Sequence, residues 1–108
     1  MKLAGFLLFF LTAADLAAGV IYGALRDNNR GVPGVEITIT GPRLNQRLTT
    51  APDGSFRLFI KESGKYHFHV TYQGKSGDAD IFSYDDPVKY DFDLRFDRAR
   101  NNYQLSRR

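Results

Sequence analysis

The sequence predicts an all-β domain, a seven-stranded antiparallel Greek-key sandwich. Two observations support this prediction: apolar residues recur at every second position in successive runs, and clusters of Gly, Pro, Asp and Asn separate the runs. Period-two alternation is typical of strands with one buried face, and the separating residues are those that favour tight turns. At 108 residues the chain is long enough for one such domain.

Turn chemistry places the boundaries of the strands. Pro52-Asp53-Gly54 predicts a reverse turn, because proline presets φ and glycine accepts a positive φ. Gly41-Pro42 ends one strand, Asp85-Asp86-Pro87 ends another, and residues 73–78 are predicted to form a loop. The predicted strands are residues 21–26, 35–40, 43–50, 56–60, 66–72, 81–84 and 88–96.

The alternation also predicts which side chains face the core. Residues of one parity on each strand are apolar, and those of the other parity are mostly polar. We expect inward positions at Ile37, Phe56, Leu58, Tyr66, Phe68, Val70, Phe92 and Leu94. Residues 88–96 show the clearest alternation, and it places Phe96 on the same face as Phe92 and Leu94.

The N-terminal segment has the pattern of a secretory signal peptide. Lys2 precedes an apolar run over residues 3–11, and small residues follow it. We therefore expect residues 1–19 to be a signal peptide, cleaved after Ala14 or after Gly19, and no transmembrane segment in the mature chain. The chain has no Cys, so the exported domain has no disulfide and depends on packing alone. We expect it in the periplasm or on the surface of a bacterial cell.

The charge is distributed unevenly along the chain. Residues 20–97 carry ten Lys and Arg against eleven Asp and Glu, a net charge of −1. Residues 98–108 carry four Arg and no acid, and we interpret them as a basic, solvated C-terminal tail. The basicity is therefore terminal and does not form a face, which argues against nucleic acid as a partner.

The turns and strands together resemble the carboxypeptidase regulatory-like domain family, which has a transthyretin-like, Ig-like sandwich. The resemblance lies in Gly31-Val32-Pro33-Gly34-Val35, in residues 49–56 (Thr-Thr-Ala-Pro-Asp-Gly-Ser-Phe) and in Gly64-Lys65-Tyr66. It covers residues 20–97, although the polar Asp78-Ala79-Asp80 segment departs from the family pattern. The resemblance implies an accessory, binding or structural module and transfers no active-site residue.

Two histidines are the main candidates for chemistry. His67 and His69 lie on one face of the strand at residues 66–72, where two imidazoles can bind one metal ion if a carboxylate completes the site. Paired imidazoles alone make a weak site, so we predict no cofactor and no tightly held metal. A carboxylate within coordinating distance of both histidines would favour the metal hypothesis. Other aspartates cluster at 78–86, but their spacing does not match a calcium loop.

The sequence thus predicts an exported, non-catalytic binding or structural module of the cell envelope, monomeric or weakly oligomeric, with no enzymatic activity. Its partner would be another envelope protein or a glycan. One alternative is a carbohydrate-binding module that uses exposed aromatic side chains, Tyr22 and Phe59 first among them; clustering of these two on one sheet would favour it. The other alternative is a small metal-binding protein that uses His67 and His69.

Overall fold

A computed structural model describes residues 19–108. This part of the chain is all β: it has nine strands in one sheet and no helix. Within it there is accordingly no helix long and apolar enough to cross a membrane. The strands are β1 (Val20–Asp27), β2 (Arg30–Gly31), β3 (Glu36–Gly41), β4 (Leu44–Thr49), β5 (Ser55–Phe59), β6 (Gly64–Tyr72), β7 (Lys75–Ser83), β8 (Val88–Asp97) and β9 (Asn102–Arg107).

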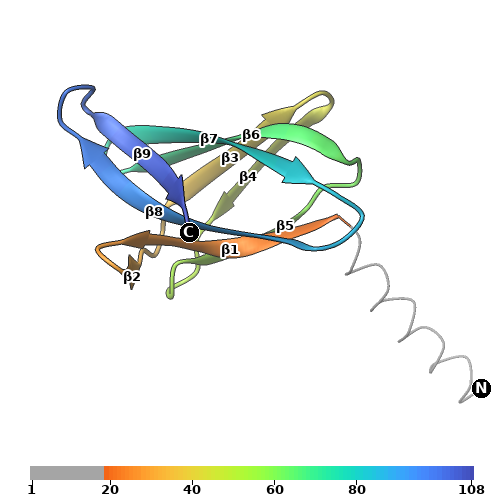
Figure 1. Ribbon diagram of the computed structural model, residues 1–108, viewed down its shortest axis with the longest axis horizontal. Coiled ribbons are helices and arrows are strands. Elements are labelled where there is room, and N and C mark those ends of the chain that lie inside the picture. The colour runs from red at the N-terminus through yellow and green to blue at the C-terminus, as the bar shows by residue number, and fades with distance from the viewer. Residues whose placement is uncertain (1–18) are drawn as a thin grey trace, which may run out of the picture.

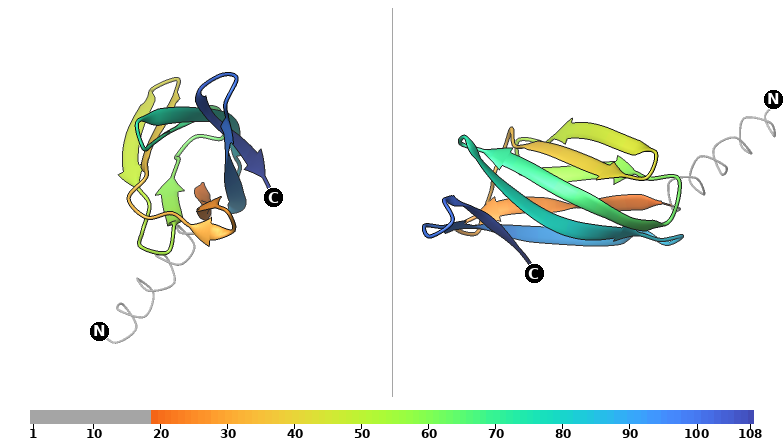
Figure 2. Two further views of the ribbon diagram at one scale, coloured as in Figure 1. Left: turned by 90° about the vertical axis from the view of Figure 1, so that its left-hand side faces the viewer. Right: turned by 90° about the horizontal axis from the view of Figure 1, so that it is seen from above.

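The sheet is mixed and curls into a half-barrel. Its order is β2-β1-β8-β9-β7-β6-β3-β4, and β5 pairs with β1 (Figure 1). Most pairs are antiparallel, but β1 runs parallel to β8 and β7 runs parallel to β9. Viewed along the strands, the sheet wraps around a central core (Figure 2). The all-β prediction is confirmed, whereas a seven-stranded, purely antiparallel Greek-key sandwich does not describe this sheet.

The core lies on the concave side of the curl. All eight side chains predicted to face inward are buried, and Ile37, Phe68 and Val70 are fully inaccessible at 0% exposure. Phe68 sits at the centre, with its ring centroid 5.4 Å from that of Phe56 and 5.1 Å from that of Phe92. Such offset aromatic pairs add to the stabilisation from burial itself. The period-two alternation therefore identified the core correctly.

Three local predictions differ from the structure. Residues 75–78 were expected to be loop, but they belong to β7, which pairs with β6 over its full length. Residues 98–108 were expected to be a solvated tail, but β9 pairs with β8 from Asn102 to Arg107 and extends the sheet beyond residue 97. Phe96 was expected to face inward, but it is 47% exposed because it lies near the end of β8, where its ring packs edge-on against Tyr103.

Candidate functional site

The candidate site begins with the alternation of β6. Tyr66, Phe68 and Val70 fill the core, so the two residues between them must point to the outer face of the sheet. His67 and His69 therefore project outward together, with ring centroids 6.4 Å apart and ring planes 28° from parallel. The buried side chains of β6 fix which face of the strand is outward, and both imidazoles lie on that face.

The hairpin between β6 and β7 supplies the partners of the histidines. Gln73 and Gly74 form its two-residue turn, and both have a positive φ, 51° and 75°, as the tight hairpin turn requires. The turn fixes a register in which His69 is opposite Asp78 and His67 is opposite Asp80. Both aspartates thus share the outer face with the imidazoles.

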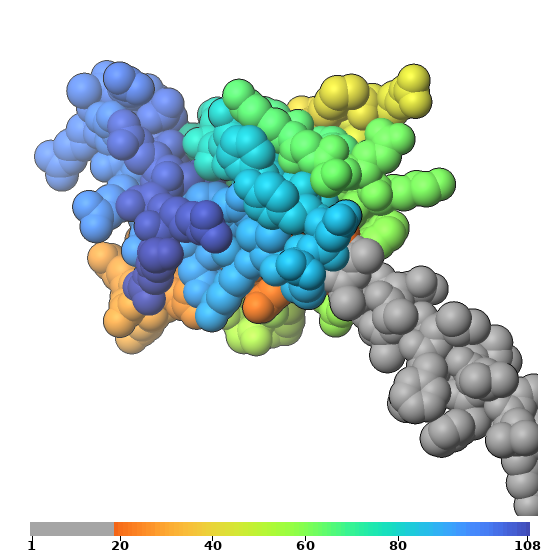
Figure 3. Space-filling view, turned by 45° about the vertical axis from the view of Figure 1, so that its right-hand side comes forward, coloured from red at the N-terminus to blue at the C-terminus, as the bar shows by residue number. Residues whose placement is uncertain are grey.

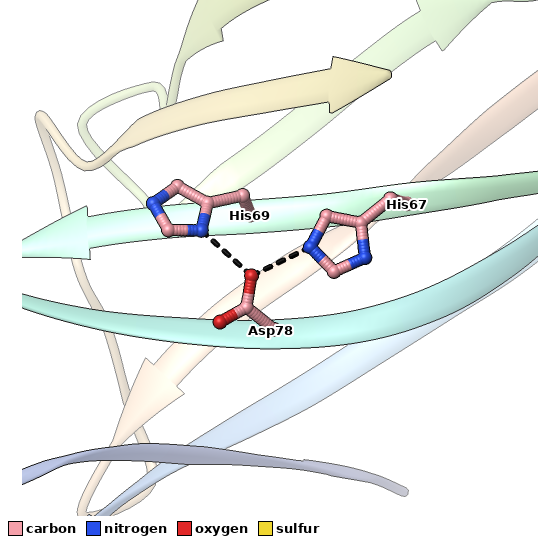
Figure 4. A group of neighbouring side chains, drawn as sticks. All are labelled: His67, His69 and Asp78. Atoms are coloured by element: carbon pink, nitrogen blue, oxygen red, sulfur yellow. Dashed lines mark hydrogen bonds and ion pairs between the residues drawn. The ribbon is translucent and has the colours of Figure 1, made fainter. Parts of the chain in front are cut away.

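One carboxylate oxygen of Asp78 lies between the two imidazoles (Figure 4). Its Oδ1 is 2.6 Å from Nε2 of His67 and 2.7 Å from Nδ1 of His69. A carboxylate oxygen only accepts hydrogen bonds, so both facing nitrogens carry a hydrogen in this arrangement. The three ligand atoms all lie within 4.8 Å of one another, and no other such group of three occurs within residues 19–108.

Hydrogen bonding controls the charge of Asp78. Burial raises the pKa of its carboxyl, but the hydrogen bonds from His69 and His67 outweigh burial, and the pKa lies below its ordinary value of 3.8. The carboxylate is therefore ionised at neutral pH. Its negative charge lies against a ring nitrogen of each histidine.

A second carboxylate, that of Asp80, lies near the other ring nitrogen of His67. Oδ1 of Asp80 is 3.8 Å from Nδ1 of His67, and its Oδ2 is 3.6 Å from Nζ of Lys65. Lys65, His67 and Asp80 all lie on the outer face, because Lys65 precedes His67 by two residues on β6 and Asp80 is the cross-strand partner of His67. The outer face of this hairpin thus carries one ammonium, two imidazoles and two carboxylates that contact one another.

The cluster is open to solvent. The side chains of His67, His69 and Asp78 are 46%, 39% and 46% exposed. In the space-filling view, atoms of β6 (green) and β7 (teal) lie at the surface beside one another (Figure 3). A metal ion held here would keep coordination positions that water or an external ligand can occupy.

The two predicted aromatic site residues lie elsewhere on the sheet. Tyr22 of β1 is opposite Arg57 of β5, and Phe59 of β5 is opposite Val20 of β1. Tyr22 and Phe59 are therefore diagonal neighbours on one face of this pair of strands, 42% and 52% exposed. A shallow cavity of about 520 Å³ lies beside Tyr22 and Arg57. The structure brings these aromatic residues together but does not join them to the histidines.

Sequence reasoning missed Asp78 and Asp80 as partners of the histidines, because it began the next strand only at residue 81. A usable signal was present in Gln73-Gly74. A two-residue turn at that point pairs each residue of one strand with a fixed partner on the other, and this rule brings residue 78 opposite residue 69.

Comparisons with known proteins support the fold alone. No protein-family model matches the chain, and no curated protein sequence matches it. A similar fold occurs in the solved structure of the Bacillus anthracis TIE protein, with a TM-score of 0.61 and 13% sequence identity. The match covers 82% of this chain and 17% of that chain, so this chain spans less than a fifth of that protein. The likeness shows a related β-fold.

Proposed function

We propose that this domain is an exported, non-catalytic binding module of the bacterial cell envelope, and that its ligand is a divalent transition-metal ion. The ion is held by Nε2 of His67, Nδ1 of His69 and Oδ1 of Asp78. One observation carries the proposal: a single carboxylate oxygen lies within 2.7 Å of a ring nitrogen of both histidines. This is the third ligand that the histidine pair lacks by itself.

The chemistry of the ligands selects the class of ion. Two imidazole nitrogens and one carboxylate oxygen form a borderline set that suits zinc, copper(II) or nickel(II) better than calcium or magnesium, which prefer oxygen alone. The negative charge of the Asp78 carboxylate attracts a dication. Because no second domain or deep apolar pocket adjoins His67, His69 and Asp78 within residues 19–108, binding or carriage of the ion is a better-supported role than turnover of a substrate.

Binding of an ion requires a small rearrangement. Ligand atoms around a tetrahedral ion at ordinary bond lengths lie about 3.3 Å apart, whereas Asp78 Oδ1 lies 2.6 and 2.7 Å from its two nitrogens. The hydrogens that bridge these contacts must also leave the two ligating nitrogens before the ion can bind there. The exposed side chains can rotate by this amount without disturbing the core.

The experiment is a titration of the purified protein with zinc, copper(II) and nickel(II), followed by elemental analysis after dialysis. We expect one ion per chain for at least one of these metals, and loss of binding in Asp78→Asn and His69→Ala. Asp85→Asn is the matched control, because it removes an exposed aspartate outside the cluster and should leave binding unchanged. Equal binding by Asp78→Asn and Asp85→Asn, or far less than one ion in the wild type, would refute the metal site.

Export and family are part of the same proposal. The pattern of Lys2 and residues 3–11 supports a signal peptide, but it falls outside the described residues. The turn sequences at 31–35 and 49–56, together with the all-β fold, support kinship with carboxypeptidase regulatory-like domains. Intact-mass analysis of protein from the envelope fraction should show loss of about fourteen to nineteen residues; full-length chain in the cytoplasm would contradict export.

A second candidate function is glycan binding. It is favoured by the shared outer face of Tyr22 and Phe59 and by Arg57 opposite Tyr22, since aromatic rings can stack on sugars and a guanidinium can donate to their hydroxyls. The test is binding to an oligosaccharide array. Tyr22→Ala should abolish any signal, while Tyr84→Ala, which removes an exposed aromatic outside β1 and β5, should not.

A further inference from the structure

The two histidines present different nitrogens to Asp78. His67 uses Nε2 and His69 uses Nδ1. The remaining nitrogen of His67, its Nδ1, faces the carboxylate of Asp80 at 3.8 Å. His69 has no second carboxylate within ion-pair distance among the described residues. The site is therefore asymmetric: among the described residues, only His67 has a carboxylate within ion-pair distance of each ring nitrogen.

This asymmetry matters because the ring nitrogen that binds a metal must not carry a hydrogen. In the ion-free arrangement Nε2 of His67 carries the hydrogen that bridges to Asp78. An ion bound at Nε2 needs the lone pair there, so the hydrogen must reside on Nδ1 instead. A carboxylate beside Nδ1 favours that tautomer and fixes the orientation of the ring.

Lys65 forms an ion pair with the other oxygen of the Asp80 carboxylate. Its ammonium nitrogen lies 3.6 Å from Oδ2 of Asp80 and leaves Oδ1 directed toward His67. Lys65 and His67 are two residues apart on β6, and Asp80 is opposite His67 on β7, so the backbone register sets all three positions.

We propose that Asp80 is the positioning residue of the metal site. When the ion occupies Nε2 of His67, Nδ1–H donates to Oδ1 of Asp80, and this contact selects the binding tautomer. Asp80 itself does not touch the ion. The inference rests on the proposed function, because it presumes that His67, His69 and Asp78 hold the ion.

The test compares zinc affinity in the wild-type chain, Asp80→Ala, Asp80→Asn and the control Asp85→Asn. Loss of the acceptor in Asp80→Ala should weaken zinc binding about 10- to 100-fold. Asp80→Asn keeps an acceptor oxygen and should recover part of the affinity, while Asp85→Asn should match the wild type. Long-range ¹H–¹⁵N spectra follow the tautomer directly: zinc should move the His67 hydrogen to Nδ1 in the wild type, and the same change should require more zinc in Asp80→Ala.

The outcomes separate this inference from the proposed function. If the wild type binds zinc and Asp80→Ala binds it within twofold as tightly, the role of Asp80 is refuted and the metal site stands. If the wild type does not bind zinc, copper(II) or nickel(II), both are refuted. Asp80 is an exposed side chain, 52% accessible, so its variants should fold; if Asp80→Ala does not, the Asp80→Asn affinity and spectrum decide the matter.

Discussion

His69 and Asp78 are direct cross-strand partners, and the 2.7 Å contact between Nδ1 and Oδ1 follows from the register of the β6–β7 hairpin. They are nine residues apart in sequence, and only the two-residue turn at Gln73 and Gly74 brings them together. A slip of one residue would turn Asp78 toward the core, since alternate strand residues face opposite sides. The candidate site therefore depends on the geometry of one turn.

Changing Gly74 should weaken this hairpin. Its φ of 75° lies in the left-handed region, where a residue with a Cβ costs about 1–2 kcal/mol. We expect Gly74→Ala to lower the free energy of unfolding by about that amount in a urea titration. Gln73→Asn is the control, because asparagine tolerates the left-handed region well. A Gly74→Ala variant as stable as the wild type would show that the turn does not hold the register.

Phe68 should be a major contributor to stability. It is fully buried and its ring packs against Phe56 and Phe92. Truncation to alanine leaves a cavity in a close-packed core, so Phe68→Ala should cost about 3–5 kcal/mol of unfolding free energy. Phe59→Ala removes a ring that is 52% exposed, and it should change stability by about 0.5 kcal/mol or less. Similar losses in both variants would contradict the assignment of faces.

The sequence predicted the direction of side chains well where the two faces of a strand differ strongly in hydrophobicity. On β6, large apolar side chains alternate with polar ones, so both the core residues and the outward histidines were predictable. On β7 the inward positions include Gly77 and Ala79, and such small residues give little hydrophobic contrast with the outward aspartates. The geometry of the candidate site depends on that strand, so the histidines could be predicted from the sequence but their carboxylate could not.

The C-terminal strand was missed for a related reason. β9 is charged and polar, with only Tyr103 and Leu105 packed against the core cluster. Its stability comes from pairing with β8 and from contacts such as that of Arg107, whose guanidinium lies 4.1 Å from the centroid of the Tyr90 ring and donates to the carbonyl of Lys89. Its pairing with the preceding strand leaves no clear hydrophobic alternation in such a short polar run.

Removal of β9 should therefore destabilise the domain. A chain that ends at Arg100 loses the pairing of Asn102–Arg107 with β8 and exposes the β8 edge. We expect a large fall in melting temperature and a tendency to aggregate. A double variant, Arg98→Ala with Arg100→Ala, removes charge but keeps the strand, and its melting temperature should stay close to that of the wild type. An unchanged melting temperature in the shortened chain would support a solvated tail.

Thr50 should stabilise the connection between β4 and β5. Its side chain is buried, and the hydroxyl donates to the carbonyl of Val32 at 2.6 Å and accepts from the amide of Val35 at 2.9 Å. Thr50→Val preserves the shape but leaves the Val35 amide without its acceptor, which costs about 1–3 kcal/mol. Thr50→Ser keeps the hydroxyl and should lose less. Urea denaturation of both variants measures the difference, and equal losses would show that the methyl group matters as much as the hydrogen bonds.

Asp53 should give the β4–β5 turn a dependence on pH. The hydroxyl and the amide of Ser55 both donate to Oδ1 of Asp53, at 2.6 and 3.0 Å. The hydroxyl contact is the main cause that lowers the pKa of Asp53 below its ordinary value of 3.8. A carboxyl with a lowered pKa in the folded state stabilises the fold above its ordinary pKa, and the contribution is lost as the pH falls through the folded value.

Ser55→Ala removes the hydroxyl donor and leaves the amide. The difference in melting temperature between wild type and Ser55→Ala should therefore be constant above about pH 5 and shrink as the pH falls below about 4. A difference that stays constant down to pH 3 would mean that the stabilisation by Ser55 does not act through the charge of Asp53.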